Sequence, residues 1–204
     1  MTTPTPSPRP RLLLAALLLL LLSGCGARQA VTYYNLTAQA PDGGAPAATG
    51  ERGPLAIGVG PVTLPEALSR AQIALRLNGQ SLRFDDYHRW SNPLADDFAQ
   101  VLLDDIAARL PTQTQVALFP WGGYFRPSHR LVVNVSHFDG ALAGEVELRA
   151  RWTIIDGTGK ETIASRQAVI RVKVAGDQYQ DLVTAQSRAV ADLADAMVAA
   201  LSAP

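Results

Sequence analysis

The sequence predicts a single α+β domain in which two amphipathic helices pack on one face of a mostly antiparallel sheet. Three observations lead to this fold class. Several segments alternate apolar and polar residues, which is typical of half-buried strands, and two segments place apolar residues three and four positions apart, which is typical of helices. Turn signals rich in Gly, Asn and Asp separate consecutive strands. The predicted order is β-β-β-α-β-β-β-β-α.

The first 24 residues have the pattern of a lipoprotein signal peptide. Arg9 and Arg11 precede an apolar run over residues 12–22, and residues 22–25 (Leu-Ser-Gly-Cys) form a lipobox. Eleven apolar residues are too few to cross a bilayer, which takes about 20. We therefore expect cleavage before Cys25 and acylation of that cysteine, which anchors stably when two or more chains are attached. A buried free cysteine is the alternative.

The residue after the cysteine predicts the target membrane. In Gram-negative cells an aspartate at this position commonly retains a lipoprotein in the inner membrane, whereas this chain has Gly26. We therefore expect the outer membrane, with the protein on its periplasmic face. Because Cys25 is the only cysteine, no disulfide is expected.

The mature chain divides into a tail and a domain. Residues 1–24 are the predicted signal peptide, residues 25–53 a lipidated segment with a flexible linker, and residues 54–204 the folded domain. Residues 37–53 are rich in Gly, Pro and Ala and lack apolar periodicity, which indicates the linker. Because core-forming periodicity begins at Leu55, a chain that starts near Gly53 is expected to fold alone.

Charge argues against a nucleic-acid partner. The chain has 18 basic and 18 acidic residues and only two lysines, Lys160 and Lys173. A nucleic-acid-binding domain normally carries a clustered excess of Lys and Arg.

The segments before the first helix predict strands. They are residues 31–36, as a short extended piece, then 55–60, 73–77 and 80–84. Asn78 and Gly79 are the residue types that a type I′ hairpin turn requires, so the third and fourth segments should form a hairpin. Asp85 and Asp86 are expected to interrupt the return strand.

The first helix is predicted to begin at Asn92 and Pro93, with Asn92 as the cap. Its apolar stripe is Leu94, Phe98, Val101, Leu102, Ile106 and Leu110. Asp96 and Asp97 would complement the helix dipole, and Pro111 would end the helix. The pair Asp104 and Asp105 is expected on the solvated face.

After the helix, four strands and a second helix are predicted. The strands are residues 115–119, 131–138, 145–155 and 162–174, and the helix covers residues 177–201. Strict alternation and an Asp-Gly-Thr-Gly turn at residues 156–159 predict that the last three strands form an antiparallel meander.

Two groups of aromatic and basic side chains fall outside the apolar stripes. They are Tyr87, Arg89 and Trp90 before the first helix, and Trp121, Tyr124 and Phe125 in a later loop. Because Trp, Tyr and Arg are enriched at the energetic centres of interfaces, we predict partner binding here. The loop is the stronger candidate, since Gly122 and Gly123 give it no packing of its own. For Trp90, the alternative to partner binding is that its side chain packs at the end of the hydrophobic core.

The sequence offers no assembled catalytic, metal or cofactor site. His88, His129 and His137 are not spaced as metal ligands, and no Gly-x-Ser-x-Gly motif occurs. We therefore expect a binding protein and not an enzyme.

Short motifs along the chain resemble the ABC-type transport auxiliary lipoproteins. They are the lipobox, Tyr33-Tyr34-Asn35-Leu36, Gly60-Pro61-Val62-Thr63-Leu64-Pro65, Gln72-Ile73, Arg89-Trp90 and Pro93-Leu94. The resemblance covers nearly all of the mature chain, although Ala67 and Ala71 stand where a tyrosine and a proline are expected.

The resemblance implies a non-catalytic outer-membrane subunit. Such a subunit docks onto a periplasm-spanning mammalian-cell-entry (MCE) protein, the partner of an ABC permease and ATPase that move lipids between membranes. Two other functions stay open: a lipid-tethered periplasmic hydrolase, and an outer-membrane assembly or cell-wall-binding lipoprotein. The aromatic surface could also bind a second copy of this chain and form a homo-oligomer.

Overall fold

The computed structural model describes residues 29–41 and 55–202. The elements are β1 (Thr32–Tyr34), β2 (Ala56–Thr63), a 3-10 turn (Glu66–Leu68), β3 (Gln72–Asn78), β4 (Ser81–Trp90), α2 (Leu94–Arg109), β5 (Gln115–Leu118), β6 (His129–Gly140), β7 (Glu145–Asp156), β8 (Thr162–Lys173) and α3 (Tyr179–Ser202). The predicted signal peptide, Cys25 and most of the predicted linker lie outside the described residues. The α+β fold class is confirmed, as are both helices and the meander.

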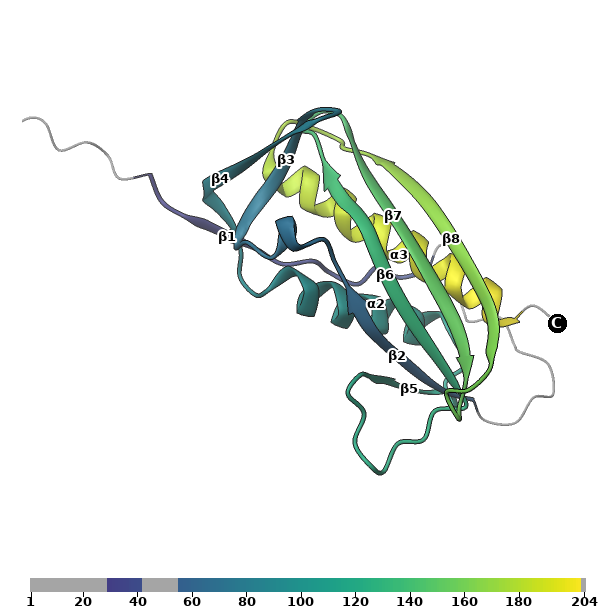
Figure 1. The fold of residues 1–204 in the computed structure, drawn as a ribbon. Helices are drawn as coiled ribbons and strands as arrows, with labels where there is room; N and C mark the ends of the chain where they lie inside the picture. Colours follow the sequence, from purple (N-terminus) through teal and green to yellow (C-terminus); the bar gives the residue numbers. More distant parts are fainter. Residues whose placement is uncertain (1–28, 42–54, 203–204) are drawn as a thin grey trace, which may run out of the picture. The chain divides into compact units, whose positions relative to one another are not determined.

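Eight strands form one sheet within these residues, and β6 lies at its centre (Figure 1). One edge of β6 pairs with β7 in antiparallel fashion, and β7 pairs with β8. The other edge pairs in parallel with β2 and, at its end, with β3. Parallel pairs also join β2 to β5 and β1 to β4, so the sheet is mixed. Most of its paired residues lie in the antiparallel pairs β3–β4, β6–β7 and β7–β8, as predicted. Parallel pairing requires long crossovers, here through α2 and the 3-10 turn, and hydrophobic alternation does not encode them.

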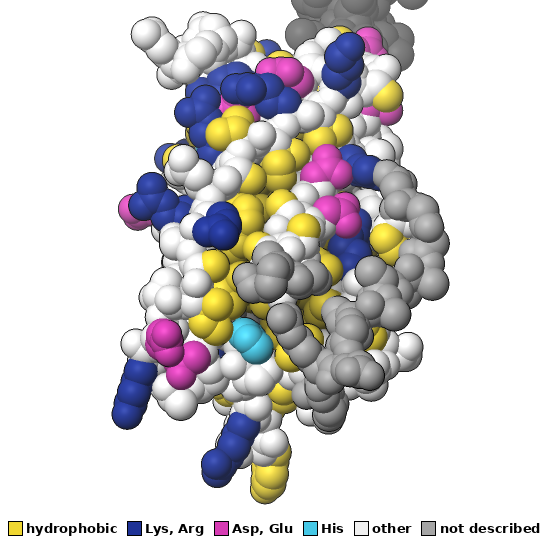
Figure 2. Space-filling model, turned by 90° about the vertical axis from the view of Figure 1, so that its right-hand side faces the viewer, with side chains coloured by type: hydrophobic (Ala, Val, Ile, Leu, Met, Phe, Trp, Pro, Cys, Tyr) yellow, Lys and Arg dark blue, Asp and Glu magenta, His cyan; other side chains and the backbone are white. Residues whose placement is uncertain are grey.

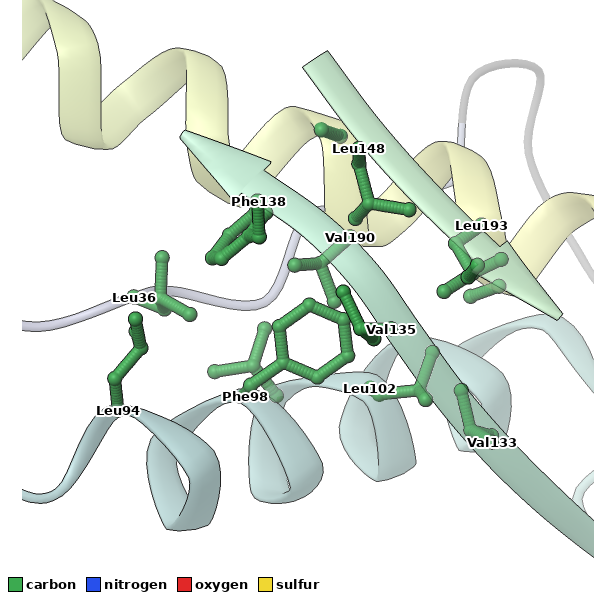
Figure 3. Close-up of a cluster of buried hydrophobic side chains, with 14 of the residues drawn as sticks. Leu36, Leu94, Phe98, Leu102, Val133, Val135, Phe138, Leu148, Val190 and Leu193 are labelled. Atoms are coloured by element: carbon green, nitrogen blue, oxygen red, sulfur yellow. The ribbon is translucent and has the colours of Figure 1, made fainter. Parts of the chain in front are cut away.

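Both helices cover the same face of the sheet, as predicted, and pack against each other (Figure 1). The core fills the space between these layers, where Phe98 of α2 meets Phe138 of β6 edge to face at 5.1 Å (Figure 3). The predicted alternation in β7 is confirmed, because its inward residues are buried: Val146, Leu148, Ala150, Trp152 and Ile154.

The edge strand β8 is less well covered. Its inward side chains Ala168, Ile170 and Val172 are only partly buried, and Val169 on its outer face is exposed. Figure 2 views the side on which β8 lies in Figure 1 and shows hydrophobic side chains in a band down that side.

Two local predictions are wrong. The β3–β4 hairpin forms, but Asn78 and Gly79 do not adopt the positive φ of a type I′ turn. Instead the Asn78 Oδ1 atom accepts hydrogen bonds from the main-chain N–H groups of Gln80 and Ser81, both at 2.9 Å. Such side-chain bonds offer the turn another way to close. Helix α2 begins one residue later than predicted, with Pro93 and not Asn92 at the cap position.

The start of the predicted linker is part of the folded domain. We call residues 35–41 the N-terminal strap. Leu36 is 4% exposed and lies beside Leu94 in the core cluster (Figure 3). The compact unit that contains the domain begins at Val31, so the domain starts well before residue 54.

Polar side chains of both helices hold the strap. The main-chain N–H of Leu36 donates to Asp97 at 2.7 Å, that of Gln39 to Asp105 at 2.7 Å, and that of Thr37 to the Ser187 hydroxyl at 3.1 Å. Asp105 was expected on a solvated face, but it is 0% exposed. The linker was predicted because this segment lacks apolar periodicity. Main-chain hydrogen bonds hold the segment instead, and they do not require a periodic pattern of apolar residues.

Candidate functional site

The aromatic loop, which we define as residues 119–125, follows β5 at the end of the sheet where β6 begins (Figure 1). Main-chain hydrogen bonds fix both sides of the connection that contains it. Phe119 donates to the Val59 carbonyl at 2.8 Å, and Ser128 donates to the Ala56 carbonyl at 2.7 Å. The loop is therefore held at both ends by β2.

Trp121 anchors the aromatic loop from within. A Cβ atom at Gly58 of β2 would lie 2.8 Å from the Trp121 ring, so the ring rests directly on the strand and only glycine leaves room for it. The Phe119 ring packs edge to face at 5.2 Å, and the Arg130 guanidinium lies 5.7 Å from the Trp121 ring. The sequence indicated a loop with no packing of its own, but the structure gives Trp121 a packed position.

Tyr124 is the exposed part of the loop. Its relative exposure is 107%, which is that of a side chain with no neighbours, while Phe125 is half-buried beside Trp121. Phe119 is also exposed, and the sequence analysis missed it because it was counted as the last residue of a strand. The exposed surface of the loop is thus formed by Tyr124 and Phe119 on a base set by Trp121.

A groove of about 520 Å³ lies next to the loop and shares Phe119 with it. Its other walls come from the end of β2, at Pro61 and Val62, and from the start of α2, at Pro93 and Asp96. Pro61-Val62 and Pro93 belong to two motifs that the sequence analysis treated separately. Folding brings both motifs to one concave, partly apolar surface, the kind of surface that holds a ligand or a partner's side chain.

The other predicted aromatic group is split by the fold. Trp90 is 4% exposed and belongs to the core, so its burial favours the alternative that it seals the domain. Arg89 is half-buried, and its Nε donates to the Asp86 carbonyl at 2.9 Å. Tyr87 lies exposed on the same strand, β4, and Figure 1 shows this strand at the other end of the sheet from β5 and the connection that follows it.

A cluster of aromatic and polar side chains joins β1 and β4 to α3. The Tyr34 hydroxyl lies 2.9 Å from His88 Nδ1, the His88 ring stacks on Tyr179 at 3.7 Å, and the Tyr179 hydroxyl donates to Asp85 at 2.9 Å. Burial, with the hydrogen bond to Asp85, raises the pKa of Tyr179 to about 12. A phenol with this pKa stays protonated at neutral pH and can donate the hydrogen bond to Asp85. The contacts of the cluster tie two strands to α3, which is a structural role.

Within the described part of the chain, no three His, Cys, Asp or Glu side chains are grouped so that they could hold a metal ion. No helix in the described ranges is long and apolar enough to cross a membrane.

Comparison with known proteins places these features in a family. The sequence profile of the ABC-type transport auxiliary lipoprotein component matches residues 34–198. None of the curated proteins compared with the chain matches it.

Two solved structures share the fold. One, described only as an uncharacterized protein, is 18% identical with a TM-score of 0.68 and covers 84% of this chain and 99% of its own. The other, from Xanthomonas campestris, is 13% identical with a TM-score of 0.65 and covers 82% of this chain and 92% of its own.

Proposed function

Because this chain belongs to the ABC-type transport auxiliary lipoprotein family, we propose that it is the accessory subunit of an ABC-type system that moves lipids between the two membranes of the cell envelope. Its proposed partner is the periplasm-spanning MCE-domain protein of that system. Acyl chains on Cys25 would anchor it to the periplasmic face of the outer membrane, as Gly26 indicates. The proposed role is binding and not catalysis.

The observation that carries this proposal is the aromatic loop. Tyr124 projects fully into solvent from a base that Trp121 and Gly58 hold in place. A tyrosine offers a large contact area with only two side-chain torsions to fix on binding, and Tyr is enriched among residues that dominate binding energy. The adjoining groove would receive side chains of the partner.

Replacing Tyr124 with alanine is expected to weaken partner binding without lowering stability. Loss of an energetically central tyrosine costs about 2 kcal/mol of binding, a roughly thirtyfold loss of affinity. Co-purification of the MCE-domain protein from detergent-solubilised envelopes, together with thermal melting, measures both quantities. Trp121→Ala is expected to lower both, since its ring packs on β2.

Val169→Ala is the matched control, because Val169 is an exposed apolar residue on β8, away from the loop. Equal co-purification of wild type, Tyr124→Ala and Val169→Ala would contradict the proposed docking surface. Capture of further copies of this chain, lost in Tyr124→Ala, would instead assign the surface to self-association.

Acylation of Cys25 is a separate prediction. Intact-mass measurement of the protein purified from membranes should show cleavage before Cys25 and added acyl chains, and density fractionation should place it in the outer membrane. Cys25→Ala should remain uncleaved and unacylated. A wild-type mass without acyl chains would refute the anchor, and inner-membrane fractionation would refute the predicted target membrane.

A further inference from the structure

Few residues separate Cys25, the predicted lipid anchor, from the first strand of the domain. Six residues, 26–31, separate Cys25 from the first residue of β1, Thr32. The strap that follows β1 is hydrogen-bonded to both α2 and α3, so residues beyond 34 do not lengthen this connection. At 3.3–3.6 Å per residue, the distance from Cys25 to Thr32 is at most about 25 Å. An anchored domain therefore stays close to the bilayer on its β1 side.

The part of the domain nearest this connection carries exposed aromatic side chains. Tyr33 is 62% exposed and stands opposite Arg89 in the β1–β4 pairing, so both point to one face of the sheet. Tyr87, two residues before Arg89 on β4, is 41% exposed, and Val31, the residue before β1, is exposed as well. We call these four residues the β1–β4 outer face.

The aromatic loop lies at the other end of the sheet. The end of β6 pairs with β3 at Leu75 and Gly140, next to β4 and β1, whereas the connection carrying the loop joins β6 at its start. A strand of 12 residues, as β6 is, spans about 40 Å. Figure 1 shows β1 and the connection after β5 well apart.

We propose that the β1–β4 outer face rests on the headgroup layer of the membrane that holds the lipid anchor; this inference depends on the acylation of Cys25 in the proposed function. Tyrosine suits this layer, because its ring is apolar and its hydroxyl remains hydrated. The Nε of Arg89 donates to the Asp86 carbonyl, and its Nη2 lies 3.9 Å from the Asp86 carboxylate, so its Nη groups can still donate hydrogen bonds to a lipid phosphate. In this orientation Tyr124 points away from the bilayer, where a periplasmic partner can reach it.

Fluorescence quenching in vesicles tests the contact with the full mature protein. Acylation occupies the Cys25 sulfur, so a cysteine introduced by Tyr33→Cys, Tyr87→Cys or Tyr124→Cys is the one thiol open to an environment-sensitive dye. Each labelled protein is reconstituted into vesicles of phosphatidylethanolamine and phosphatidylglycerol that contain lipids spin-labelled at the headgroup. Quenching is expected at positions 33 and 87, and no quenching is expected at position 124. Equal quenching at all three positions, or none at 33 and 87, would overturn the proposal.

Two further measurements keep the proposal separate from the anchor and from misfolding. Intact mass and vesicle flotation establish acylation first: a protein without acyl chains refutes the proposed anchor, whereas an acylated, floating protein without quenching refutes only the membrane contact. Arg89→Glu combined with Tyr33→Ser should reduce quenching at position 87 while flotation and the circular dichroism spectrum stay unchanged. Unchanged quenching in this variant would show that the side chains of the face do not hold it to the lipid.

Discussion

Replacing Leu36 with alanine is expected to lower the free energy of unfolding by about 2–5 kcal/mol, the usual loss for a buried leucine. Leu36 is the buried apolar residue of the strap and contacts the same core as Leu94 and Phe138. Its loss opens a cavity between α2 and the sheet and weakens the docking of the strap. Chemical denaturation followed by circular dichroism measures the change.

Leu77→Ala is the matched control, since it makes the same chemical change at an exposed leucine of β3. Its effect should stay within about 0.5 kcal/mol. For the same reason a chain that begins near Gly53 should melt well below the mature protein. If Leu36→Ala and Leu77→Ala unfold at the same denaturant concentration, the strap does not belong to the cooperative unit.

Arg109→Met is expected to cost about 3–5 kcal/mol, because it breaks a buried charge network and leaves a carboxylate without its partner. Arg109 Nη1 lies 3.3 Å from Asp105 Oδ1 and also donates to the Gln39 carbonyl at 3.2 Å, while its Nε donates to Asp195 at 2.6 Å. The network therefore joins α2, α3 and the strap. Arg166→Met on β8, where the arginine is exposed, is the control and should change stability little.

The loss in Arg109→Met should depend on pH. Burial raises the pKa of Asp105, against the hydrogen bonds from Gln39 and Arg109 that lower it. A raised pKa in the folded state means that the stability linked to this group is fully present below its unfolded pKa and is lost as pH rises through the folded pKa. Without Arg109 the pKa of Asp105 should rise further, so the variant should suffer more at neutral pH than under mildly acidic conditions.

Asp105→Asn in the Arg109→Met background should recover much of the loss, because it removes the unpaired charge and keeps an oxygen to accept the Gln39 N–H. Denaturation of the single and double variants at both pH values measures the coupling. An equal loss at both pH values, with no recovery in the double variant, would contradict an uncompensated Asp105 charge as its cause.

The sequence predicted those parts of the fold that apolar periodicity determines. Strict alternation in β7 and the stripes of α2 and α3 each bury one face, so their residues reveal the element directly. The parallel pairing of β2 with β5 and β6 depends on where the crossovers lead, which the pattern does not contain. The strap was missed because its main-chain N–H groups donate to Asp97 and Asp105. From the sequence, Asp97 was expected only to complement the dipole of the first helix, and Asp105 was expected to face solvent.

The aromatic loop, too, was predictable from the sequence only in part. Its composition identified Trp121 and Tyr124 as candidate partner contacts, but nothing in the sequence near them indicated that Gly58, more than sixty residues earlier, lies under the Trp121 ring. Likewise, the Gly60-Pro61-Val62 and Pro93 motifs form one groove only because β2 lies beside the start of α2. Such contacts depend on tertiary structure and appear only when the sheet is assembled.

Photo-crosslinking in living cells tests the docking of the aromatic loop most directly. A photoreactive phenylalanine analogue replaces Tyr124 in the full-length lipoprotein, and the same analogue at Val169 on β8 serves as the control. The proposed function predicts a crosslink from position 124 to the periplasm-spanning MCE-domain protein, identified by mass spectrometry, and none from position 169. A crosslink to that protein from position 169 but not from position 124 would contradict the proposed docking surface, and no crosslink to it from either position would contradict the proposed partner.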